Sequence, residues 1–576
     1  MSRIHVLPVH LQNKIAAGEV IERPASVVKE LLENAIDAGS TSIAVDIEKA
    51  GRRLIRISDN GSGMGNSDAQ NAFQRYATSK IRSEDDLYAL HTLGFRGEGL
   101  AAIAAVSLVG LATAEQGRIG TCINVSAGTV ESVGECAATG TTVEVRDLFY
   151  NTPARRKFLK SDSTENYHIT DTVTREALVH PSLRFSLRVD GGEVMLTASA
   201  GSRRERIMQI FGKEFTDDLI EDVVEAAGMR AEMFVGNPGM TRSTRLSQYV
   251  FVNQRPVKDQ TISQAIYRAF NGALEKNQHP VFFIFFETDP GHVDCNVHPT
   301  KREVRFQDKS VVFRFITDAA RRIVLGASLQ QSVKTLSEVR SFDYRIGTQP
   351  HEESRSAASG LGQQPHMVSD RAETYVPERV PFVSLGETLI AFSDNDGLII
   401  MDYHAAHERV NYERLLDASA AMPAAQLLFP QQVKLQPHEA AVLLENQQLI
   451  ATMGIDVEDF GAGSVLVRSV PEILTGADMN SLMQDVAGAL LLRREEPEPL
   501  AGTDETPEPV ARRKRSVAAQ LACHSSIRGR EIPDEYRLAK LKRALEQTRN
   551  GDRCPHGRPT VIRLSLDALK KMFRKS

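Results

Sequence analysis

Residues 24–39 read PASVVKELLENAIDAG and predict one helix with a marked beginning and end. A proline suits the first helical position, and a glycine suits the residue just past the last turn. Apolar side chains recur with helical spacing at Val27, Val28, Leu31, Leu32, Ala35 and Ile36. Glu30, Asn34 and Asp37 are spaced four and three residues apart, so they stack on the opposite face. Such a row of oxygen groups can activate water and hold a hard cation, although the stretch alone favours a solvated polar face.

The composition is that of a globular protein with several domains. The chain has 576 residues, of which 41% are hydrophobic and 25% charged, so it is too long for one core. Its formal net charge of -5 argues neither for nor against nucleic acid, because a DNA-binding protein of this balance must concentrate its basic residues locally.

The cysteines and the N-terminus indicate an intracellular location. The cysteines are Cys122, Cys136, Cys295, Cys523 and Cys554. This odd, sparse set predicts no disulfide framework and a reducing cytoplasm. The first ten residues lack a signal region, and residues 99–114 predict a buried helix running into a strand and not a membrane span.

Glycine-rich segments follow the first helix. Residues 41–60 alternate as two strands with Gly51 between them, and the second strand ends in DNGSG, which is also an ordinary hairpin signal. The words ATSK (residues 77–80) and GFRGEGL (residues 94–100) come next. Glycines before a helix let backbone N–H groups approach phosphate oxygens. The pattern GxxxxGK[ST] is absent from the sequence, so a P-loop is excluded.

Four segments in this order resemble the motifs of the GHKL ATPases, a group that includes gyrase B, histidine kinases and MutL. They are Glu30-x-x-x-Asn34, Asp59-x-Gly61-x-Gly63, Gly94-x-x-Gly97-x-Gly99 and Gly140-Thr141-Thr142. The longer words IAAGEV, ERPASVVKE, GFRGE and DLFYNTPARRKFL are similar to the MutL family of DNA mismatch repair proteins. This resemblance covers most of the first 330 residues.

The resemblance implies an ATP site that uses Mg²⁺. Glu30 would be the general base, Asn34 would bind Mg²⁺, and Asp59 would accept a hydrogen bond from the adenine amino group. The lid over the phosphates would be formed by Thr78–Lys80 and Gly94–Gly99, and Gly99 stands where the family usually has alanine. The other implied nucleotide-binding residues are Asp37, Gly61, Gly63, Thr78, Ser79, Lys80, Gly94, Phe95, Arg96, Gly97, Leu100 and Thr142.

Beyond residue 203 the pattern resembles the family's second domain, a small α/β unit like ribosomal protein S5. Strands at residues 248–253 and 280–287 flank a helical stretch at 261–274. The word NVHPTKREVRF resembles the loop that brings a lysine, here Lys301, to the γ-phosphate as a catalytic charge; a surface lysine is the alternative. The residues that could line a DNA groove are Arg242, Arg245, Arg255 and Lys258, and ordinary solvated charge explains them equally well.

The predicted fold is mixed α/β with four parts. Residues 1–202 would form a GHKL (Bergerat) ATPase sandwich and residues 203–330 the S5-like unit. Residues 331–378 are polar, lack an apolar period and predict a flexible linker. Residues 379–576 would form an α/β domain for dimerisation and endonuclease activity, as the resemblance implies.

A second chemical motif lies in the last part, at DYHAAHERVNYE (residues 402–413). His404 and Glu408 are one helical turn apart, and Asp402 suits the helix cap, so they could form half of a metal site. The distant words ACH and CPHGRP add thiols and imidazoles. The usual alternative for such a cysteine is a small buried hydrophobe.

These words resemble the endonuclease of MutL proteins that nick DNA themselves, with the pattern DQHAxxExxxxE, ACR, CPHGRP and FxR. Tyr403 stands for the glutamine and His524 for the arginine or lysine. The implied metal ligands are Asp402, His404, Glu408, Cys523, Cys554 and His556, with Asp402 catalytic. Thiolates favour Zn²⁺ and oxygen ligands favour Mn²⁺ or Mg²⁺, so a mixed site is expected.

The sequence thus predicts an ATP-dependent mismatch repair protein that relays detection by MutS to DNA incision by its own nuclease. The alternative is a matchmaker with an inactive nuclease motif that acts only through partners. The resemblance also implies a homodimer in a bacterial-type cytoplasm, associated with the nucleoid, and no membrane. Residues 426–430, QLLFP, resemble peptides that bind the replication sliding clamp, whereas the favoured alternative is a core strand that turns at Pro430.

Overall fold

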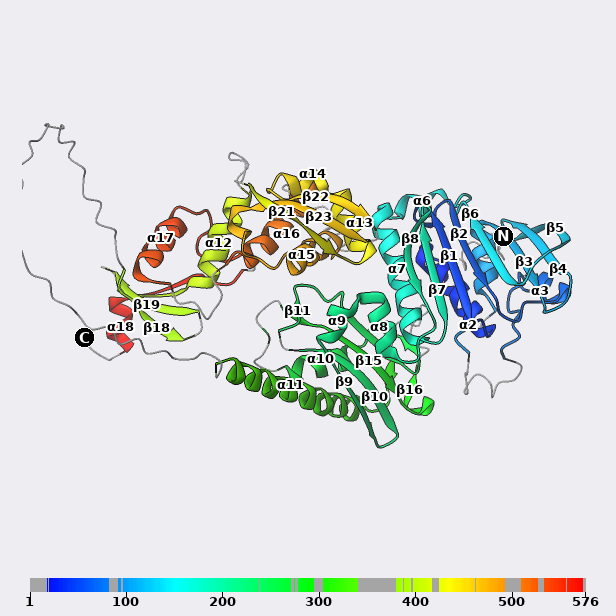
Figure 1. Cartoon of the computed structure of the whole chain (residues 1–576), viewed down its shortest axis with the longest axis horizontal. Coiled ribbons are helices and arrows are strands. Elements are labelled where there is room, and N and C mark those ends of the chain that lie inside the picture. Colours follow the sequence, from blue (N-terminus) through cyan, green and yellow to red (C-terminus); the bar gives the residue numbers. More distant parts are fainter. Residues whose placement is uncertain are drawn as a thin grey trace, which may run out of the picture. The chain divides into compact units, whose positions relative to one another are not determined.

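The computed structural model describes residues 18, 20–81, 92–94, 97–237, 239–270, 274, 278–294, 304–339, 380–386, 388–394, 397–416, 424–461, 463–492, 509–526, 533–555 and 557–572. The chain divides into two compact units (Figure 1). The first contains Met1–Ala327 and Ala418–His524, and the second contains Ser328–Asp417 and Ser525–Ser576. Across the described ranges, no helix has the length and apolar character needed to cross a membrane.

The first unit begins with an eight-stranded sheet in the order β5-β4-β3-β6-β2-β1-β7-β8. Its strands are β1 (Ser42–Glu48), β2 (Leu54–Asp59), β3 (Leu108–Ala114), β4 (Gly120–Ser126), β5 (Thr129–Cys136), β6 (Gly140–Arg146), β7 (Arg184–Val189) and β8 (Gly192–Thr197). All neighbours are antiparallel except β1 and β7. The accompanying helices are α2 (Pro24–Asp37), α3 (Asn66–Asn71), α5 (Gly99–Val106), α6 (Pro153–Phe158) and α7 (Asp162–Val179).

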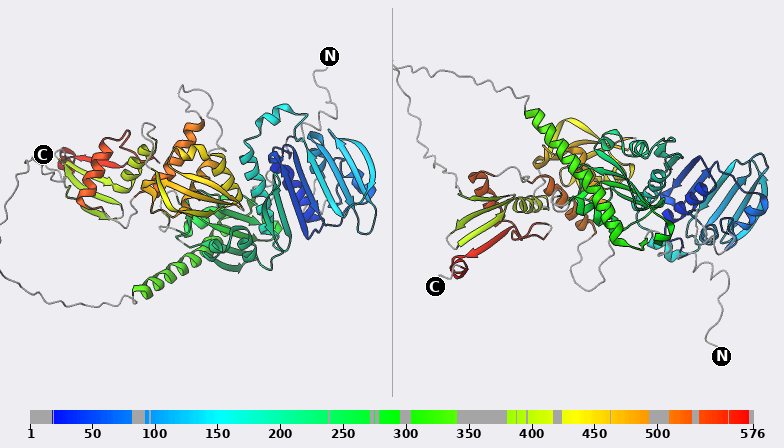
Figure 2. Two further views of the ribbon diagram at one scale, coloured as in Figure 1. Left: turned by 45° about the horizontal axis from the view of Figure 1, so that its top comes forward. Right: turned by 90° about the horizontal axis from the view of Figure 1, so that it is seen from below.

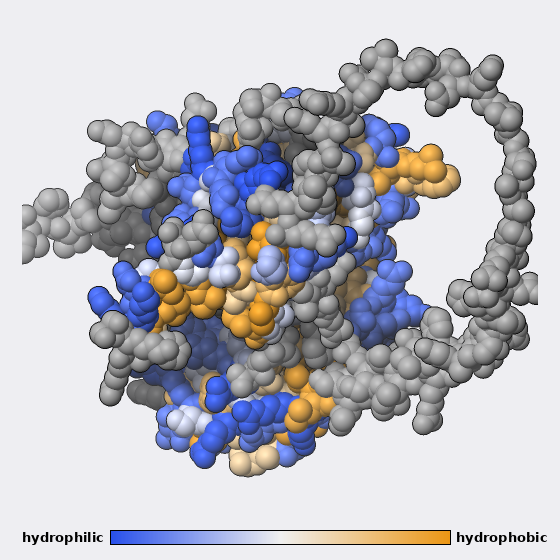
Figure 3. Space-filling view, turned by 90° about the vertical axis from the view of Figure 1, so that its left-hand side faces the viewer, coloured by the Kyte–Doolittle hydropathy of each residue, from blue (hydrophilic) through white to orange (hydrophobic). Residues whose placement is uncertain are grey.

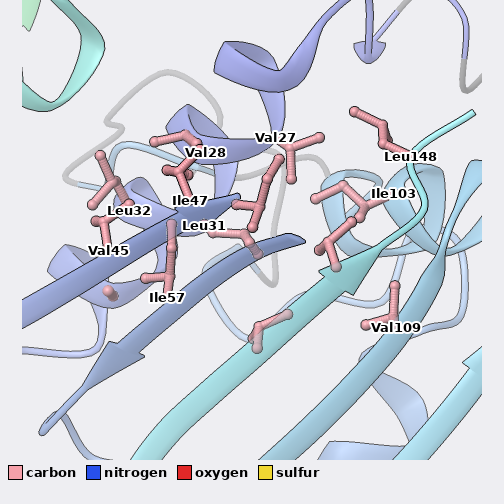
Figure 4. Packing of buried hydrophobic residues seen from close by; sticks show 14 of the residues in the cluster. Val27, Val28, Leu31, Leu32, Val45, Ile47, Ile57, Ile103, Val109 and Leu148 are labelled. Atoms are coloured by element: carbon pink, nitrogen blue, oxygen red, sulfur yellow. The ribbon is translucent and has the colours of Figure 1, made fainter. Parts of the chain in front are cut away.

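Helix α2 has the predicted limits and orientation. It begins at Pro24, and Gly39 after its end has φ +72°, which a glycine adopts without a steric penalty. Its apolar face packs on β1 and β2, and side chains such as Leu31 and Ile57 belong to the same core (Figure 4). The α5–β3 succession, a buried helix followed by a strand, is also as predicted. Burial of the apolar face therefore turns the polar face of α2 away from the sheet.

A five-stranded sheet follows in the order β13-β12-β15-β10-β9. Its strands are β9 (Leu219–Ala226), β10 (Met229–Gly236), β12 (Gln248–Val252), β13 (Arg255–Pro256) and β15 (Phe282–Glu287). One face packs on α10 (Gln260–Ala269) and α11 (Lys309–Val339), and Figure 2 shows α11 as the long green helix. The other face contacts α8 (Arg203–Phe211) and α9 (Lys213–Asp217). Small ladders pair β11 (Thr241–Arg242) with β14 (His279–Pro280) and β16 (Val293–Asp294) with β17 (Arg305–Phe306).

The later part of the first unit is a three-stranded antiparallel sheet in the order β21-β23-β22. Its strands are β21 (Ala424–Lys434), β22 (Asp456–Gly461) and β23 (Ser464–Pro471). Its helices are α13 (Pro437–Glu445), α14 (Gln447–Ala451), α15 (Met479–Leu492) and α16 (Pro509–His524).

The second unit is a four-stranded antiparallel sheet in the order β18-β19-β20-β24. Its strands are β18 (Val383–Gly386), β19 (Leu389–Asp394), β20 (Gly397–Asp402) and β24 (Val561–Ser565). One face is covered by α12 (Tyr403–Leu416) and α17 (Glu535–Glu546), and α18 (Leu566–Met572) follows β24. The architecture is therefore mixed α and β, as predicted.

Two predictions about local structure are corrected. The composition predicts a flexible linker from residue 331, but α11 continues as a helix to Val339; residues 340–378 lie outside the described ranges. The cysteine count predicts no disulfide, but Cys122 on β4 and Cys136 on β5 are joined by one, with a Cα–Cα distance of 5.8 Å. These strands are neighbours, with Cys122 opposite Gly134, so the hairpin register brings the two thiols together.

Candidate functional site

The polar face of α2 carries the three residues that the sequence singles out. Glu30 and Asp37 are half-buried and Asn34 is exposed, whereas the side chains on the opposite, apolar face are buried. The helix thus presents a carboxylate, an amide and a second carboxylate along one side, which is the spacing that the sequence predicts.

Asp37 organises the segments around this face. Its Oδ2 atom accepts a hydrogen bond from Lys80 Nζ at 2.6 Å and one from the Gly94 N–H at 3.1 Å. Its Oδ1 atom accepts the Leu93 N–H at 3.0 Å. Lys80 also donates to Asn34 Oδ1 at 2.9 Å, and its own N–H donates to Thr78 Oγ1 at 3.2 Å. The two predicted lid segments therefore meet at one carboxylate, beside an amide oxygen that already faces a positive charge.

Glu30 lies against the start of α5. A Cβ atom placed on Gly99 would be 2.5 Å from Glu30 Oε2, so the glycine leaves room for the carboxylate at that position. Leu100, the next residue of α5, packs against the core. The glycine that departs from the family's alanine is therefore the residue that contacts the predicted general base.

Asp59 lies at the end of β2 beside β6. Its Oδ1 atom accepts the Gly61 N–H at 2.8 Å and the Ser40 hydroxyl at 3.1 Å. Burial raises the pKa of the Asp59 carboxyl, although both hydrogen bonds oppose that change. Thr142 lies on the neighbouring strand and donates its hydroxyl to Ser58 Oγ at 3.0 Å. A partly desolvated acceptor at a strand end suits the amino group of a purine.

Most of the other predicted nucleotide-binding residues are near these two clusters in sequence and structure. Gly63 has φ +67° and lies against the Ala114 carbonyl, so a side chain there would collide with the backbone. The Gly97 carbonyl accepts the N–H of Tyr76, two residues before the first lid segment, at 2.9 Å, and Ser79 lies between Thr78 and Lys80. The residues Phe95, Arg96 and Lys301 lie outside the described ranges, so their roles stay predictions.

The basic residues predicted for a DNA groove have several different surroundings. The guanidinium of Arg242 lies 6.0 Å from the Phe215 ring, and that of Arg245 lies 5.7 Å from the Tyr267 ring. Lys258 is exposed. Arg255 Nη2 donates to the Thr92 carbonyl at 3.2 Å, a contact that no feature of the sequence pattern indicates.

In the second unit, Asp402, His404 and Glu408 begin α12 as predicted. Asp402 Oδ1 accepts the Ala405 N–H at 3.1 Å and so caps the helix. His404 Nε2 lies 3.4 Å from Glu408 Oε1, and Glu408 is buried. Tyr403, which replaces the family's glutamine, is buried in the core and starts a regular helix.

Arg558, the arginine of the CPHGRP motif, contacts this group. Its Nη2 atom lies 3.4 Å from Glu408 Oε2. Although burial opposes it, the charges of Glu408, Cys554 and Asp402 raise the pKa of Arg558. The predicted ligand Glu408 is therefore paired with a guanidinium, and the charges of Asp402 and Cys554 act on that guanidinium in the same direction.

The full predicted ligand set is not assembled within the described residues. None of the groups of His, Cys, Asp and Glu in those ranges is arranged to hold a metal ion, and His556 lies outside them. Cys554 is buried in the second unit, whereas Cys523 is exposed on α16 in the first unit. His524 Nε2 lies 2.8 Å from Asp485 Oδ2. The donor set has the chemistry of a mixed thiolate, imidazole and carboxylate site.

The helix bearing Glu30 and Asn34, the strand end at Asp59 and the glycines before α5 define an ATPase domain of the GHKL class. Residues 21–150 match the family described as "Histidine kinase-, DNA gyrase B-, and HSP90-like ATPase". Residues 207–325 match "DNA mismatch repair protein, C-terminal domain", and residues 383–532 match "MutL C terminal dimerisation domain".

Two MutL proteins are similar to this chain over its whole length. A DNA mismatch repair protein MutL from Thermodesulfovibrio yellowstonii is 38% identical over 100% of both chains. One from Geobacter sulfurreducens is 38% identical over 100% of this chain and 99% of the relative. A solved Aquifex aeolicus MutL ATPase domain complexed with ADP is 27% identical, with a TM-score of 0.37 over 52% of this chain and 98% of that one. The chain belongs to the MutL family of DNA mismatch repair proteins.

Proposed function

We propose that this protein uses Mg²⁺-dependent ATP hydrolysis to control DNA strand incision in mismatch repair. The observation that carries the proposal is the polar face of α2, where Asp37 holds Lys80 and the Leu93–Gly94 backbone beside Glu30 and Asn34. Its test is to measure ATP turnover and plasmid nicking on the same preparations of Glu30→Ala and Asp402→Asn protein. The first variant should lose turnover and the second should lose nicking.

In the ATP site, different residues of this chain have catalytic, metal-binding and nucleotide-binding roles. Glu30 accepts a proton from the attacking water and orients it, and Asn34 supplies an oxygen to Mg²⁺. The bound Mg²⁺ would neutralise charge on the triphosphate oxygens. Asp59 recognises the adenine amino group, and Lys80, Lys301 and the lid segments bind the phosphates. The position of Glu30, half-buried against Gly99 at the start of α5, supports its role, because a general base must lie within reach of the reacting group.

For incision, Asp402, His404, Glu408, Cys523, Cys554 and His556 would bind Zn²⁺ and Mn²⁺. The metal would polarise a phosphodiester oxygen and supply hydroxide at neutral pH. The contact between Glu408 and the Arg558 guanidinium supports the use of Glu408 for a cation.

The same contact also favours the second candidate, a MutL-type matchmaker without nuclease activity that acts through MutS and other partners. An arginine that satisfies Glu408 could replace a metal permanently. Plasmid nicking in Mn²⁺ distinguishes the two candidates, because a matchmaker would nick no faster than its Asp402→Asn variant.

A homodimer through the second unit is supported by an apolar sheet face. Residues opposite one another across a ladder project on the same side, and the register aligns Val383, Ala391, Ile400 and Ile562 in one row. The other side of the sheet carries the core under α12 and α17. Val383 is 66% and Ile562 53% exposed. Figure 3, which views the protein from the side where Figure 1 draws β18 and α18, shows apolar side chains gathered on this end.

The double variant Val383→Glu, Ile562→Glu is expected to convert the dimer into a monomer of 63.5 kDa without loss of secondary structure. Charges on an apolar interface must be desolvated on association, whereas they are harmless on a monomer's surface. Sedimentation equilibrium without nucleotide measures the mass. Leu196→Glu, on the exposed edge strand β8, is the matched control and should remain dimeric. A double variant that still sediments as a dimer would place the interface elsewhere.

Binding of a sliding clamp is supported by the exposure of residues 426–430. Leu428 is 88% and Phe429 79% exposed, which contradicts the favoured alternative of a core strand. The β21–β23 register jumps between Gln426 and Gln431, so the intervening residues leave the ladder as an irregular segment. A glutamine followed by two free apolar side chains can fill a groove on a partner.

The variant Gln426→Ala, Phe429→Ala is expected to weaken clamp binding roughly 100-fold, because anchoring aromatic side chains dominate such interfaces. Surface plasmon resonance with the purified clamp measures the affinity. The melting temperature should be unchanged, since both side chains are exposed. Phe460→Ala, an exposed aromatic on β22 of the same sheet, is the control. Equal affinities for all three proteins would remove residues 426–430 as the binding segment.

A further inference from the structure

Three consecutive residues, Thr92, Leu93 and Gly94, are held from two sides. On one side, Asp37 of α2 accepts the N–H groups of Leu93 at 3.0 Å and Gly94 at 3.1 Å. On the other side, Arg255 of β13 donates to the Thr92 carbonyl at 3.2 Å. These residues therefore connect the helix that carries the predicted catalytic face with the five-stranded sheet.

The segment between the two anchors is short and internally bonded. The Thr92 hydroxyl donates to the Gly94 carbonyl at 2.8 Å, so the turn is restrained from within. A Cβ atom on Gly94 would lie 3.1 Å from Lys80 Nζ, so this backbone lies directly against the ammonium group. A shift of the Thr92 carbonyl would therefore be transmitted to the Asp37–Lys80 pair.

Arg255 is placed by a tight hairpin. Val252 pairs with Arg255 across β12 and β13, and the two residues between them, Asn253 and Gln254, have φ of +46° and +63°. A two-residue turn with positive φ at both positions fixes the register of the strands that it joins. The Asn253 side chain also accepts the Thr288 N–H at 2.9 Å, which attaches the turn to the end of β15. The guanidinium thus projects from a rigid part of the fold.

We propose that Arg255 is a positioning residue for ATP turnover. Its guanidinium holds the Thr92–Gly94 backbone against Asp37, and Asp37 in turn holds Lys80 on Asn34 Oδ1. A hydrogen bond from a charged donor is stronger and more directional than one between neutral groups, so it suits this task. The proposal rests on the ATPase activity proposed above. It means that the five-stranded sheet positions residues of α2 through the Thr92–Gly94 backbone.

The test compares Arg255→Ala and Arg255→Lys with wild type and with Arg268→Ala, an exposed arginine on α10 of the same sheet region. Hydrogen exchange of the Leu93 and Gly94 amides is measured without nucleotide, and kcat and KM for ATP are measured separately. Arg255→Ala is expected to speed exchange of both amides about tenfold and to lower kcat about tenfold, the scale of one charged hydrogen bond. Arg255→Lys should give intermediate values, and Arg268→Ala should match wild type.

Two outcomes would overturn the proposal. One is wild-type exchange and kinetics in Arg255→Ala. The other is a loss confined to DNA binding, which would assign Arg255 to a DNA groove. If Arg255→Ala unfolds, the amide exchange and kcat of Arg255→Lys test the proposal instead. Lysine keeps the positive charge but lacks the planar guanidinium. If the wild-type protein hydrolyses no ATP, the proposed function fails, whereas the exchange rates of Leu93 and Gly94 still test the bridge.

Discussion

Replacement of Glu30 by alanine is expected to remove ATP turnover and to leave ATP binding intact. Loss of a general base lowers a rate roughly 100- to 10,000-fold, and no other carboxylate occupies the same position on α2. Asp37, two turns further along, has both oxygens engaged with Lys80, Leu93 and Gly94, so it is not free to take over.

Binding should survive because the groups expected to hold the nucleotide are elsewhere. Asp59 lies at the end of β2 with its own hydrogen bonds to Gly61 and Ser40. Asn34 and Lys80 remain paired in the variant. A lower kcat with an unchanged dissociation constant is the expected signature of a group that acts only in the transition state.

The measurement is steady-state phosphate release together with equilibrium binding of a fluorescent ATP analogue. Glu22→Ala removes an exposed carboxylate just before the same helix and is the matched control. Glu30→Gln keeps the size of the side chain and one acceptor oxygen but cannot take up a proton, so it should be as inactive as the alanine variant. Turnover at the wild-type rate in either Glu30 variant would exclude this residue as the base.

The local features of the site could be predicted from sequence because they depend on neighbouring residues. The limits of α2 follow from Pro24 and Gly39, and the direction of Glu30, Asn34 and Asp37 follows from the apolar residues on the other face. Asp59 at a strand end follows from the alternation of residues 54–59 and the glycines after it.

Contacts between distant segments could not be predicted in this way. The hydrogen bond between Arg255 and Thr92 joins residues 163 positions apart and depends on tertiary packing, not on either local pattern. The Cys122–Cys136 disulfide depends on the register of a hairpin, which a cysteine count does not contain. Composition also missed the helical residues 331–339, because they extend a helix whose buried first turns are nucleated by packing.

Replacement of Asp402 by asparagine is expected to abolish nicking of supercoiled plasmid in Mn²⁺ without disturbing the fold. Asp402 caps α12 through Oδ1, and asparagine caps a helix about as well as aspartate. The substitution therefore removes a negative charge and keeps the hydrogen bond. Mutation of residues that hydrogen-bond to metal ligands already lowers activity about 10- to 100-fold. Loss of a ligand itself should therefore lower the nicking rate by more than roughly 100-fold.

The charge of Asp402 is also expected to affect Mn²⁺ binding, because Arg558 lies in the same group of side chains. The Arg558 guanidinium lies 3.4 Å from Glu408 Oε2, so a metal that binds Glu408 would compete with this cation, and the charge of Asp402 favours either one. Neutralising Asp402 should therefore weaken Mn²⁺ binding, which isothermal titration measures apart from nicking. Asp552→Asn makes the same chemical change at an exposed aspartate near Cys554 and should nick like wild type. Equal, slow nicking by wild type, Asp402→Asn and Asp552→Asn would mean that the activity comes from a contaminant, and the matchmaker function would then stand.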